Sequence, residues 1–197
     1  MDDLRPGDSD DRLYFLLSGT VRTYKMYQNP KEATTALLKD GGVFGALDLV
    51  KTGSQEKFAK ALTETRVVEV RKAVVAWLVK RKPEVSFAIF SAFSDRRRMS
   101  DDLIASLLPR EVSSRLAALL LNLAERFGED DGTGAILIDV RLSHQELANM
   151  FASTREAVSK SINEFRRNGL LGGRTPKTIV LLNREALSDW AEGGVGR

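Results

Sequence analysis

The sequence has no cysteine, a single histidine and no long apolar run, and each of these shortages excludes a class of protein. Without cysteine there is no disulfide, no zinc finger and no cysteine-ligated iron–sulfur cluster. Metal-dependent barrel enzymes need two or three histidines beside a carboxylate, whereas this chain has only His144. It also contains no nucleophile-elbow phrase and no phosphate-binding loop. We therefore expect neither an enzyme nor a metal or cofactor site.

The hydrophobic pattern also bears on where the protein works. No stretch of about 18 uninterrupted apolar residues occurs, which argues against a membrane-spanning helix. The start, MDDLRPGDSDDRL, has no apolar core of the length found in signal peptides. We therefore expect a cytoplasmic protein without a membrane partner.

Residues 142–168 have the pattern of a helix-turn-helix. The first helix is predicted to begin at Ser143, whose side chain can accept from a free amide, and Glu146 completes the capping-box spacing. The second helix is predicted to be capped by Ser153 or Thr154. Its packing stripe recurs at i, i+4 and i+8 and consists of Ala157, Val158, Ser161, Ile162 and Phe165.

The other face of the second helix carries Arg155, Glu156, Ser159, Lys160 and Asn163. These side chains supply the donors and acceptors that read base edges in the major groove. An ordinary amphipathic helix pair would carry a similar mix on its solvent face, so the face alone leaves both interpretations open. The local charge favours DNA, because residues 141–184 hold eight basic and three acidic side chains in a chain whose net charge is +3.

A glycine-rich segment and a short apolar strand, TIVLLN, follow this pair of helices. Together they predict the hairpin wing of a winged helix. A hairpin that only closes the core is the alternative, and the apolar strand must pack in the core in either case.

Residues 142–182, in particular LSHQELANMFASTREAVSKSINEFRRNGLL, resemble the DNA-binding domain of the cyclic-AMP receptor and fumarate-nitrate regulator superfamily. The S-x-R-E-x-V-x-[RK] core of that family's recognition helix is matched by Ser153, Arg155, Glu156, Val158 and Lys160. The resemblance implies that Arg155 and Glu156 read a G·C step in each half of a TGTGA-like palindrome, with Ser159 and Lys160 beside them. Lysine stands here where the family more often has arginine, and it lacks the planar bidentate fork.

The same resemblance implies the contacts around the bases and the partners. Phosphates would be held by Ser143, His144 and Gln145 at the amino end of the first helix, and by Thr154 and Lys177. The partners would be double-stranded DNA, a second copy of the chain and RNA polymerase.

Residues 1–82 are predicted to form a β jelly-roll, because turn signals separate several short β-prone runs. Within them LYFLLSGTVRTYK, with VFGALDLV further on, resembles the effector domain of the same superfamily. The family's first strand or two would lie before Met1.

Two segments of this domain bear on the effector. Nucleotide-binding members of the family have a G-E-L segment and an Arg-Ser or Arg-Thr pair, where this chain has Gly45-Ala46-Leu47 and Lys57-Phe58. A buried cyclic phosphate would lose charge-assisted hydrogen bonds worth roughly 1.5–3 kcal/mol each, so cyclic AMP is not expected.

The segments are more similar to the cyanobacterial nitrogen-control regulators, which bind 2-oxoglutarate at this place. The resemblance implies an effector pocket lined by Phe44, Gly45, Ala46, Leu47, Lys57, Arg96 and Asp101. A pocket filled by the protein's own side chains, in a regulator that needs no ligand, is the open alternative.

Residues 83–108 predict a long helix that opens at Pro83 and is broken by Pro109. Side chains at roughly heptad spacing predict a coiled-coil seam between two parallel copies, and they are Ile89, Phe93, Ser100, Leu103 and Leu107. Packing of the same face on the jelly-roll is the alternative.

The predicted organisation is thus α+β: a cyclic-nucleotide-binding-like jelly-roll at 1–82, a dimerisation helix at 83–108 and a winged helix-turn-helix domain at 109–197. It predicts a homodimeric transcription activator that binds a palindrome. An architectural DNA-bending protein without a sensor is the remaining alternative.

Overall fold

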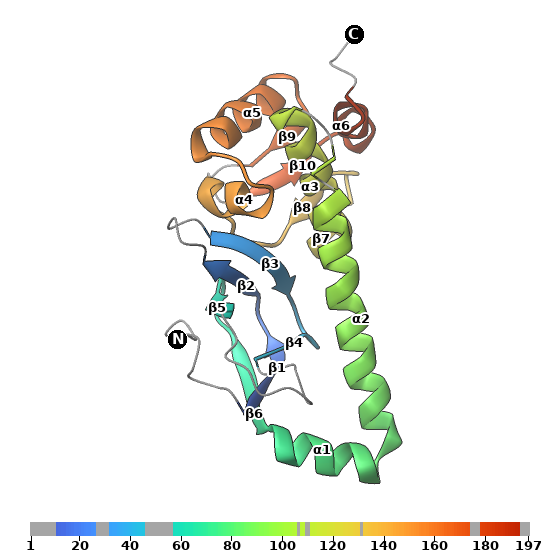
Figure 1. Cartoon of the computed structure of the whole chain (residues 1–197). Helices are drawn as coiled ribbons and strands as arrows, with labels where there is room; N and C mark the ends of the chain where they lie inside the picture. The colour runs from blue at the N-terminus through green and yellow to red at the C-terminus, as the bar shows by residue number, and fades with distance from the viewer. Residues whose placement is uncertain are drawn as a thin grey trace. The chain divides into compact units, whose positions relative to one another are not determined.

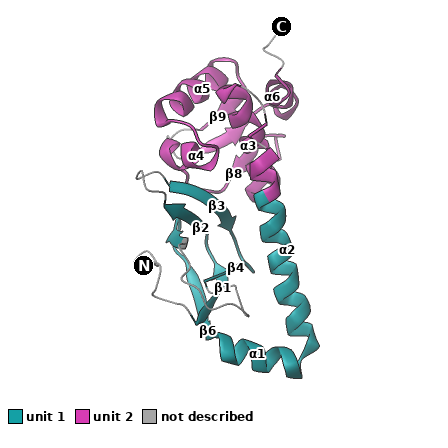
Figure 2. Ribbon diagram, viewed as in Figure 1, with its two compact units in different colours: residues 1–100 teal, residues 101–197 magenta. Residues whose placement is uncertain are grey.

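The structure is a computed structural model that describes residues 11–26, 32–45, 57–105, 107–108, 111–130, 132–173 and 178–193, except for the side chain of Lys57 (Figure 1). The chain divides into two compact units, residues 1–100 and 101–197 (Figure 2). One long helix, α2 (Pro83–Ala105), contributes to both. No helix of the described residues is long and apolar enough to span a membrane.

Two three-stranded antiparallel sheets form the first unit. Their strand orders are β4 (Val43–Gly45), β1 (Arg12–Ser18), β6 (Arg66–Arg71) and β3 (Glu32–Leu38), β2 (Val21–Met26), β5 (Lys57–Ala61). Gly19, with φ of 96°, makes the turn between β1 and β2, where a Cβ would collide with the carbonyl oxygen of Glu64. The predicted β-roll is confirmed.

Two helices close this unit, α1 (Lys72–Arg81) and the first part of α2. A core cluster of Leu13, Val43, Val75 and Ile89 joins strands to helices, and Phe93 packs against it. Further along α2, the sulfur of Met99 lies 3.0 Å from the backbone nitrogen of Leu37, and the Ser100 hydroxyl donates to the carbonyl oxygen of Thr35 at 3.3 Å. One face of α2 is therefore packed on the strands of its own chain.

The predicted coiled-coil seam falls mainly on this packed face. Ile89 and Leu103 are each only 7% exposed, Phe93 is in the core, and the hydroxyl of Ser100 is bonded to β3. Only Leu107 is largely open, at 42%. Ile89, Phe93 and Ser100 therefore pack on the β-roll of their own chain, and Leu103 is buried as well. The open face of α2 carries a different set of side chains.

The second unit begins with α3 (Val112–Phe127), whose buried stripe includes Leu116, Leu119, Leu120 and Leu123, all at 0% exposure. Four short antiparallel strands follow in the order β7 (Gly128–Asp130), β8 (Ile136–Ile138), β10 (Ile179–Leu181), β9 (Leu171–Gly172). The helices α4 (His144–Met150), α5 (Arg155–Arg167) and α6 (Arg184–Ala191) complete the unit.

The strands β9 and β10 form the predicted wing, with Leu181 opposite Leu171 and Val180 opposite Gly172. The second unit is thus a winged helix-turn-helix, and with the β-roll it gives the predicted α+β fold. Pro109, the predicted helix breaker, and Lys177 in the wing lie outside the described residues.

Candidate nucleic-acid interface

The helix α4 starts with the predicted capping box. The Ser143 hydroxyl accepts from the backbone nitrogen of Glu146 at 3.2 Å, and the Glu146 carboxylate accepts from the Ser143 backbone nitrogen at 2.9 Å and from its hydroxyl at 2.8 Å. Because the two residues satisfy each other's free amides, the helix begins at a defined residue.

The turn between α4 and α5 is tight. Ala152 has φ of 53°, the left-handed region that side chains other than glycine rarely adopt. The backbone nitrogen of Ser153 returns to the carbonyl oxygen of Ala148 at 3.0 Å. Thr154 caps α5 by accepting from the backbone nitrogen of Ala157 at 3.2 Å, which settles the choice between Ser153 and Thr154.

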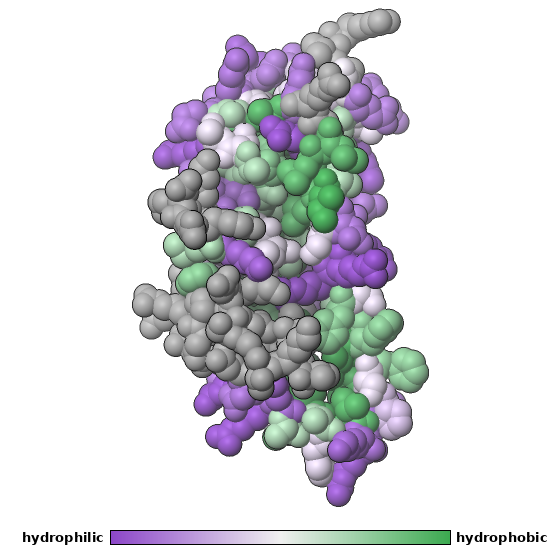
Figure 3. Space-filling model, in the orientation of Figure 1, coloured by the Kyte–Doolittle hydropathy of each residue, from purple (hydrophilic) through white to green (hydrophobic). Residues whose placement is uncertain are grey.

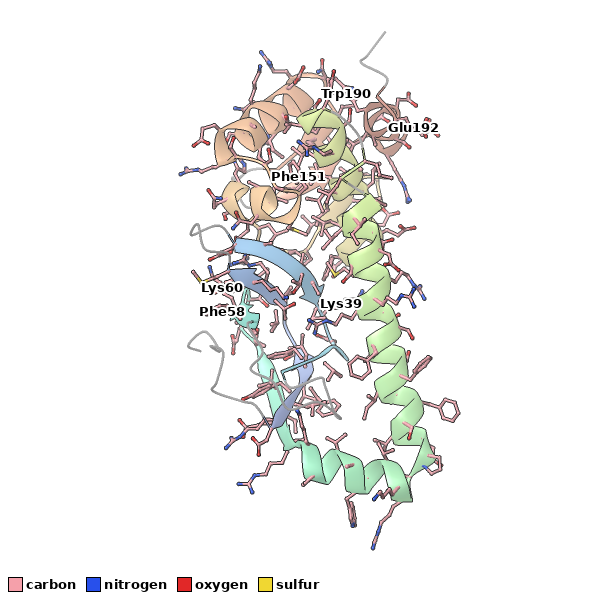
Figure 4. The ribbon with its side chains drawn as sticks, in the orientation of Figure 1. Lys39, Phe58, Lys60, Phe151, Trp190 and Glu192 are labelled. Atoms are coloured by element: carbon pink, nitrogen blue, oxygen red, sulfur yellow. The ribbon has the colours of Figure 1, made fainter. Side chains whose placement is uncertain are left out.

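The helix α5 has a buried face and an open face, as its sequence pattern predicted. Val158, Ile162 and Phe165 are 0–1% exposed, and the ring of Phe165 makes a T-shaped contact with Trp190, 5.2 Å between centroids. Figure 4 labels Trp190 on α6. The predicted base-reading side chains lie on the other side, where Arg155, Glu156 and Lys160 are exposed and Ser159 is half-buried.

A side-chain contact joins α4 to α5. Nδ1 of His144 lies 2.7 Å from Oγ of Ser159, and the Ser159 hydroxyl donates to the carbonyl oxygen of Arg155 at 2.8 Å. Burial lowers the pKa of His144, and the positive charges of Arg166 and Arg155 lower it further. No sequence pattern indicates this contact, because the two residues are 15 positions apart and share no periodicity.

The other predicted phosphate contacts lie around the same two helix starts. The side chains of Ser143 and Thr154 are occupied as caps, and Gln145 is exposed and donates to the Asn149 side chain at 2.9 Å. Ser143, His144 and Gln145 thus lie at the start of α4, where His144 contacts Ser159 of α5, and Thr154 lies at the start of α5.

The predicted effector pocket is only partly within the described residues, which exclude Ala46, Leu47 and the side chain of Lys57. Phe44 is buried and stacks on Tyr14 at 5.2 Å between ring centroids. Gly45 has φ of 94°, and a Cβ there would lie 2.8 Å from the Tyr14 ring, so the strand end requires glycine.

Two members of the predicted pocket come from α2. Nη1 of Arg96 donates to the carbonyl oxygen of Val43 at 3.5 Å, and burial lowers the pKa of this arginine. Asp101 is exposed. The structure therefore brings Arg96 next to the strand that carries Phe44 and Gly45.

A second arginine of the β-roll gave no signal in the sequence. Arg22 is 1% exposed, forms an ion pair with Glu32, and places its guanidinium 4.4 Å from the centroid of the Tyr24 ring. Tyr24 in turn stacks on Phe58, which Figure 4 labels on β5. Charged side chains on strands are mostly exposed, so nothing in the alternation of β2 predicted this burial.

Comparisons with known proteins match both units. The cyclic nucleotide-binding domain family matches residues 4–82, and the Crp-like helix-turn-helix domain family matches residues 114–190. Over 185 residues the chain is 35% identical to the global nitrogen regulator of Synechocystis sp., a match that covers 93% of this chain and 81% of that protein. The chain belongs to the cyclic-AMP receptor and fumarate-nitrate regulator superfamily.

Further members of this superfamily are similar along most of the chain. A CRP-like cAMP-activated global transcriptional regulator of Mycobacterium tuberculosis is 31% identical over 183 residues, 92% of this chain and 80% of that protein. The crystal structure of a CRP-family transcriptional regulator from Thermus thermophilus matches with a TM-score of 0.78 and 26% identity, covering 100% of this chain and 99% of that one. The protein is therefore a DNA-binding transcription regulator and not an enzyme.

We predict that Ala152→Gly raises the free energy of unfolding by up to about 1 kcal/mol. A left-handed alanine costs roughly 1–2 kcal/mol, and glycine removes most of this while losing about 0.5–1 kcal/mol more entropy on folding. Urea unfolding of both proteins measures the difference. Ala148→Gly, in the helical part of α4, is the matched control and should destabilise; no gain at Ala152 would mean that the turn is unstrained.

Proposed function

We propose that the protein is a homodimeric, sequence-specific transcription activator that inserts α5 of each protomer into one major groove of a palindrome. The observation that carries this proposal is the open face of α5, where Arg155, Glu156 and Lys160 are exposed while the opposite face is buried. A helix held this way by a preceding helix and a tight turn is the arrangement with which such domains read DNA.

The chemistry of that face fits a G·C step. Arg155 can donate two parallel hydrogen bonds to guanine, and Glu156 can accept from the amino group of cytosine. Lys160 can donate to a neighbouring guanine, and Ser159 lies beside it with its hydroxyl engaged by Arg155 and His144. Together with the sequence resemblance, this set supports a TGTGA-like half-site.

Phosphate contacts would come from the side chains around the two helix starts. His144 contacts Ser159 of α5, Gln145 follows it in the first turn of α4, and Ser143 and Thr154 cap the starts of α4 and α5. Lys177 of the wing is proposed from the sequence alone. An activator of this kind requires contact with RNA polymerase.

The dimer is proposed to form along the open face of α2 rather than along the packed one. Phe87, Phe90 and Ile104 of α2 are 62–76% exposed, and Leu108, beyond the end of the helix, is 80% exposed. Figure 3 shows hydrophobic surface over the lower part of α2, with hydrophilic side chains above it. Positions at alternating intervals of three and four along α2 are Phe87, Phe90, Ser94, Arg97, Asp101 and Ile104, and Leu108, beyond the end of the helix, continues these intervals in the sequence. This is the spacing of a two-stranded coiled coil, which would set two α5 helices about 34–36 Å apart along the DNA.

Two candidates remain for the effector, and cyclic AMP is not among them because Ala46 and Lys57-Phe58 replace the groups that hold it. The first candidate is a regulator that needs no ligand. The second is a 2-oxoglutarate-responsive regulator, which the half-buried cation of Arg96 beside Val43 favours and which the 35% identity to a global nitrogen regulator supports.

The base-reading role is tested by selecting bound sequences from a randomised duplex pool. We expect the native protein to enrich a TGTGA-like palindrome. Arg155→Ala should lose about 1–3 kcal/mol of binding and relax the preference at one base pair per half-site. An equal loss on every sequence would assign Arg155 to phosphate, and no enriched sequence would favour an architectural protein.

The dimer face is tested by adding a charge to it. Ile104→Glu should give a folded monomer in sedimentation, with weak binding to the palindrome, because two carboxylates would be buried in the seam. Val74→Glu, at an exposed valine of α1, is the matched control and should leave the dimer mass unchanged. A dimer of Ile104→Glu with native affinity would remove this face from the interface.

The effector is tested by repeating the selection with no ligand, with cyclic AMP and with 2-oxoglutarate. Equal enrichment in all three indicates a constitutive reader, and enrichment only with 2-oxoglutarate indicates the nitrogen-type regulator. A response to cyclic AMP would contradict the interpretation of Ala46 and Lys57. Arg96→Met should abolish a 2-oxoglutarate response while leaving the enriched sequence itself the same.

A further inference from the structure

The contacts around His144 bear on which of its ring nitrogens carries the proton. The hydroxyl of Ser159 has a single hydrogen, and the carbonyl oxygen of Arg155, 2.8 Å away, can accept it. With the hydrogen placed there, the Ser159 oxygen, 2.7 Å from Nδ1 of His144, accepts from an Nδ1–H group. A neutral imidazole has only one N–H, so Nε2 carries a lone pair and no proton.

The charges around the ring favour this neutral form in the free protein. Burial lowers the pKa of His144 from its ordinary value of 6.5, and Arg166 and Arg155 of α5 lower it further. Glu146, the acidic residue in the first turn of α4, directs its carboxylate to the amide and hydroxyl of Ser143. Two cations from the recognition helix thus act on the imidazole.

Binding of DNA changes both the charges around the His144 ring and the hydrogen-bond partner available to Nε2. With α5 in the groove, the phosphates that flank it bring negative charge to the side of His144, opposing the two arginines. Phosphate oxygens only accept hydrogen bonds, so an unprotonated Nε2 offers them nothing, whereas Nε2–H of an imidazolium gives a charge-assisted bond. Both nitrogens of the imidazolium are donors, so the bond from Nδ1 to Ser159 is kept when Nε2 is protonated.

We propose that each protomer takes up one proton at Nε2 of His144 when it binds its operator, so that DNA affinity is coupled to pH through this residue. The inference rests on the proposed DNA-reading mode of α5. His144 then has two roles, because it holds Ser159 and the first turn of α5 through Nδ1 and supplies a pH-dependent phosphate contact through Nε2.

The direction of the effect follows from linkage. Phosphate raises the pKa of His144 in the complex above that in the free protein, so binding strengthens as the pH falls between these two values. One proton per protomer gives at most about a tenfold gain in the association constant for each pH unit and protomer. Above both pKa values His144 stays neutral in the free protein and in the complex, and the association constant no longer depends on pH through this residue.

The experiment measures the dissociation constant for the selected palindrome between about pH 5 and 8, the range in which histidine changes charge, at constant ionic strength. The native protein should bind more tightly as the pH falls. His144→Gln should bind weakly at every pH, because its amide stays neutral. His144→Arg should bind tightly at every pH, because it keeps a positive donor. Comparison of the two variants separates the effect of the charge from the effect of losing the histidine side chain.

A measurement on the unchanged protein gives an independent readout. The chain has one histidine, so the Cε1 proton of His144 gives a single resonance whose titration needs no assignment. Its pKa should be higher in the DNA complex than in the free protein. An unchanged pKa, a flat native profile, or a His144→Gln variant with the native slope would each overturn the proton uptake while leaving palindrome recognition intact. Loss of palindrome preference at every pH would instead overturn the proposed function, and this inference with it.

Discussion

The packing of one face of α5 is the interaction on which the proposed reading surface depends. Val158, Ile162 and Phe165 are buried almost completely, and Phe165 makes a T-shaped contact with Trp190 of α6. A helix of 13 residues is marginal in water by itself, so its orientation comes from this packing and from the Thr154 cap. Because the buried stripe fixes the rotation of the helix, it also determines that Arg155, Glu156 and Lys160 face outward together.

The long helix α2 also has a packed face and an open face. Its inner face contacts the β-roll through Ile89, Met99 and Ser100, and its open face carries large apolar side chains that no monomer needs to expose. A ligand that moved the β-roll strands would act on the inner face, and the proposed dimer uses the outer one. The helix is therefore suited to shift a population of dimers between two arrangements, with or without a small molecule.

The sequence predicted the local features of the molecule well because they depend on residues a few positions apart. The capping box of Ser143 and Glu146 and the buried stripe of α5 depend on spacings of three and four residues, and the structure confirms both. Which face of α2 forms the dimer seam could not be predicted in this way. Two faces of that helix carry apolar side chains at heptad-compatible spacing, and periodicity contains no information on which one meets the strands.

By itself the sequence thus determined the family, the order of the two units, the helix-turn-helix and which residues lie on the open face of α5, since motif and period are local properties. Only the tertiary structure decided which face of α2 is open, that Arg22 is buried against Tyr24, and that His144 meets Ser159. Each of these depends on side chains brought together from different elements. Such contacts arise from packing in three dimensions, and spacing along the chain does not encode them in a form that can be read directly.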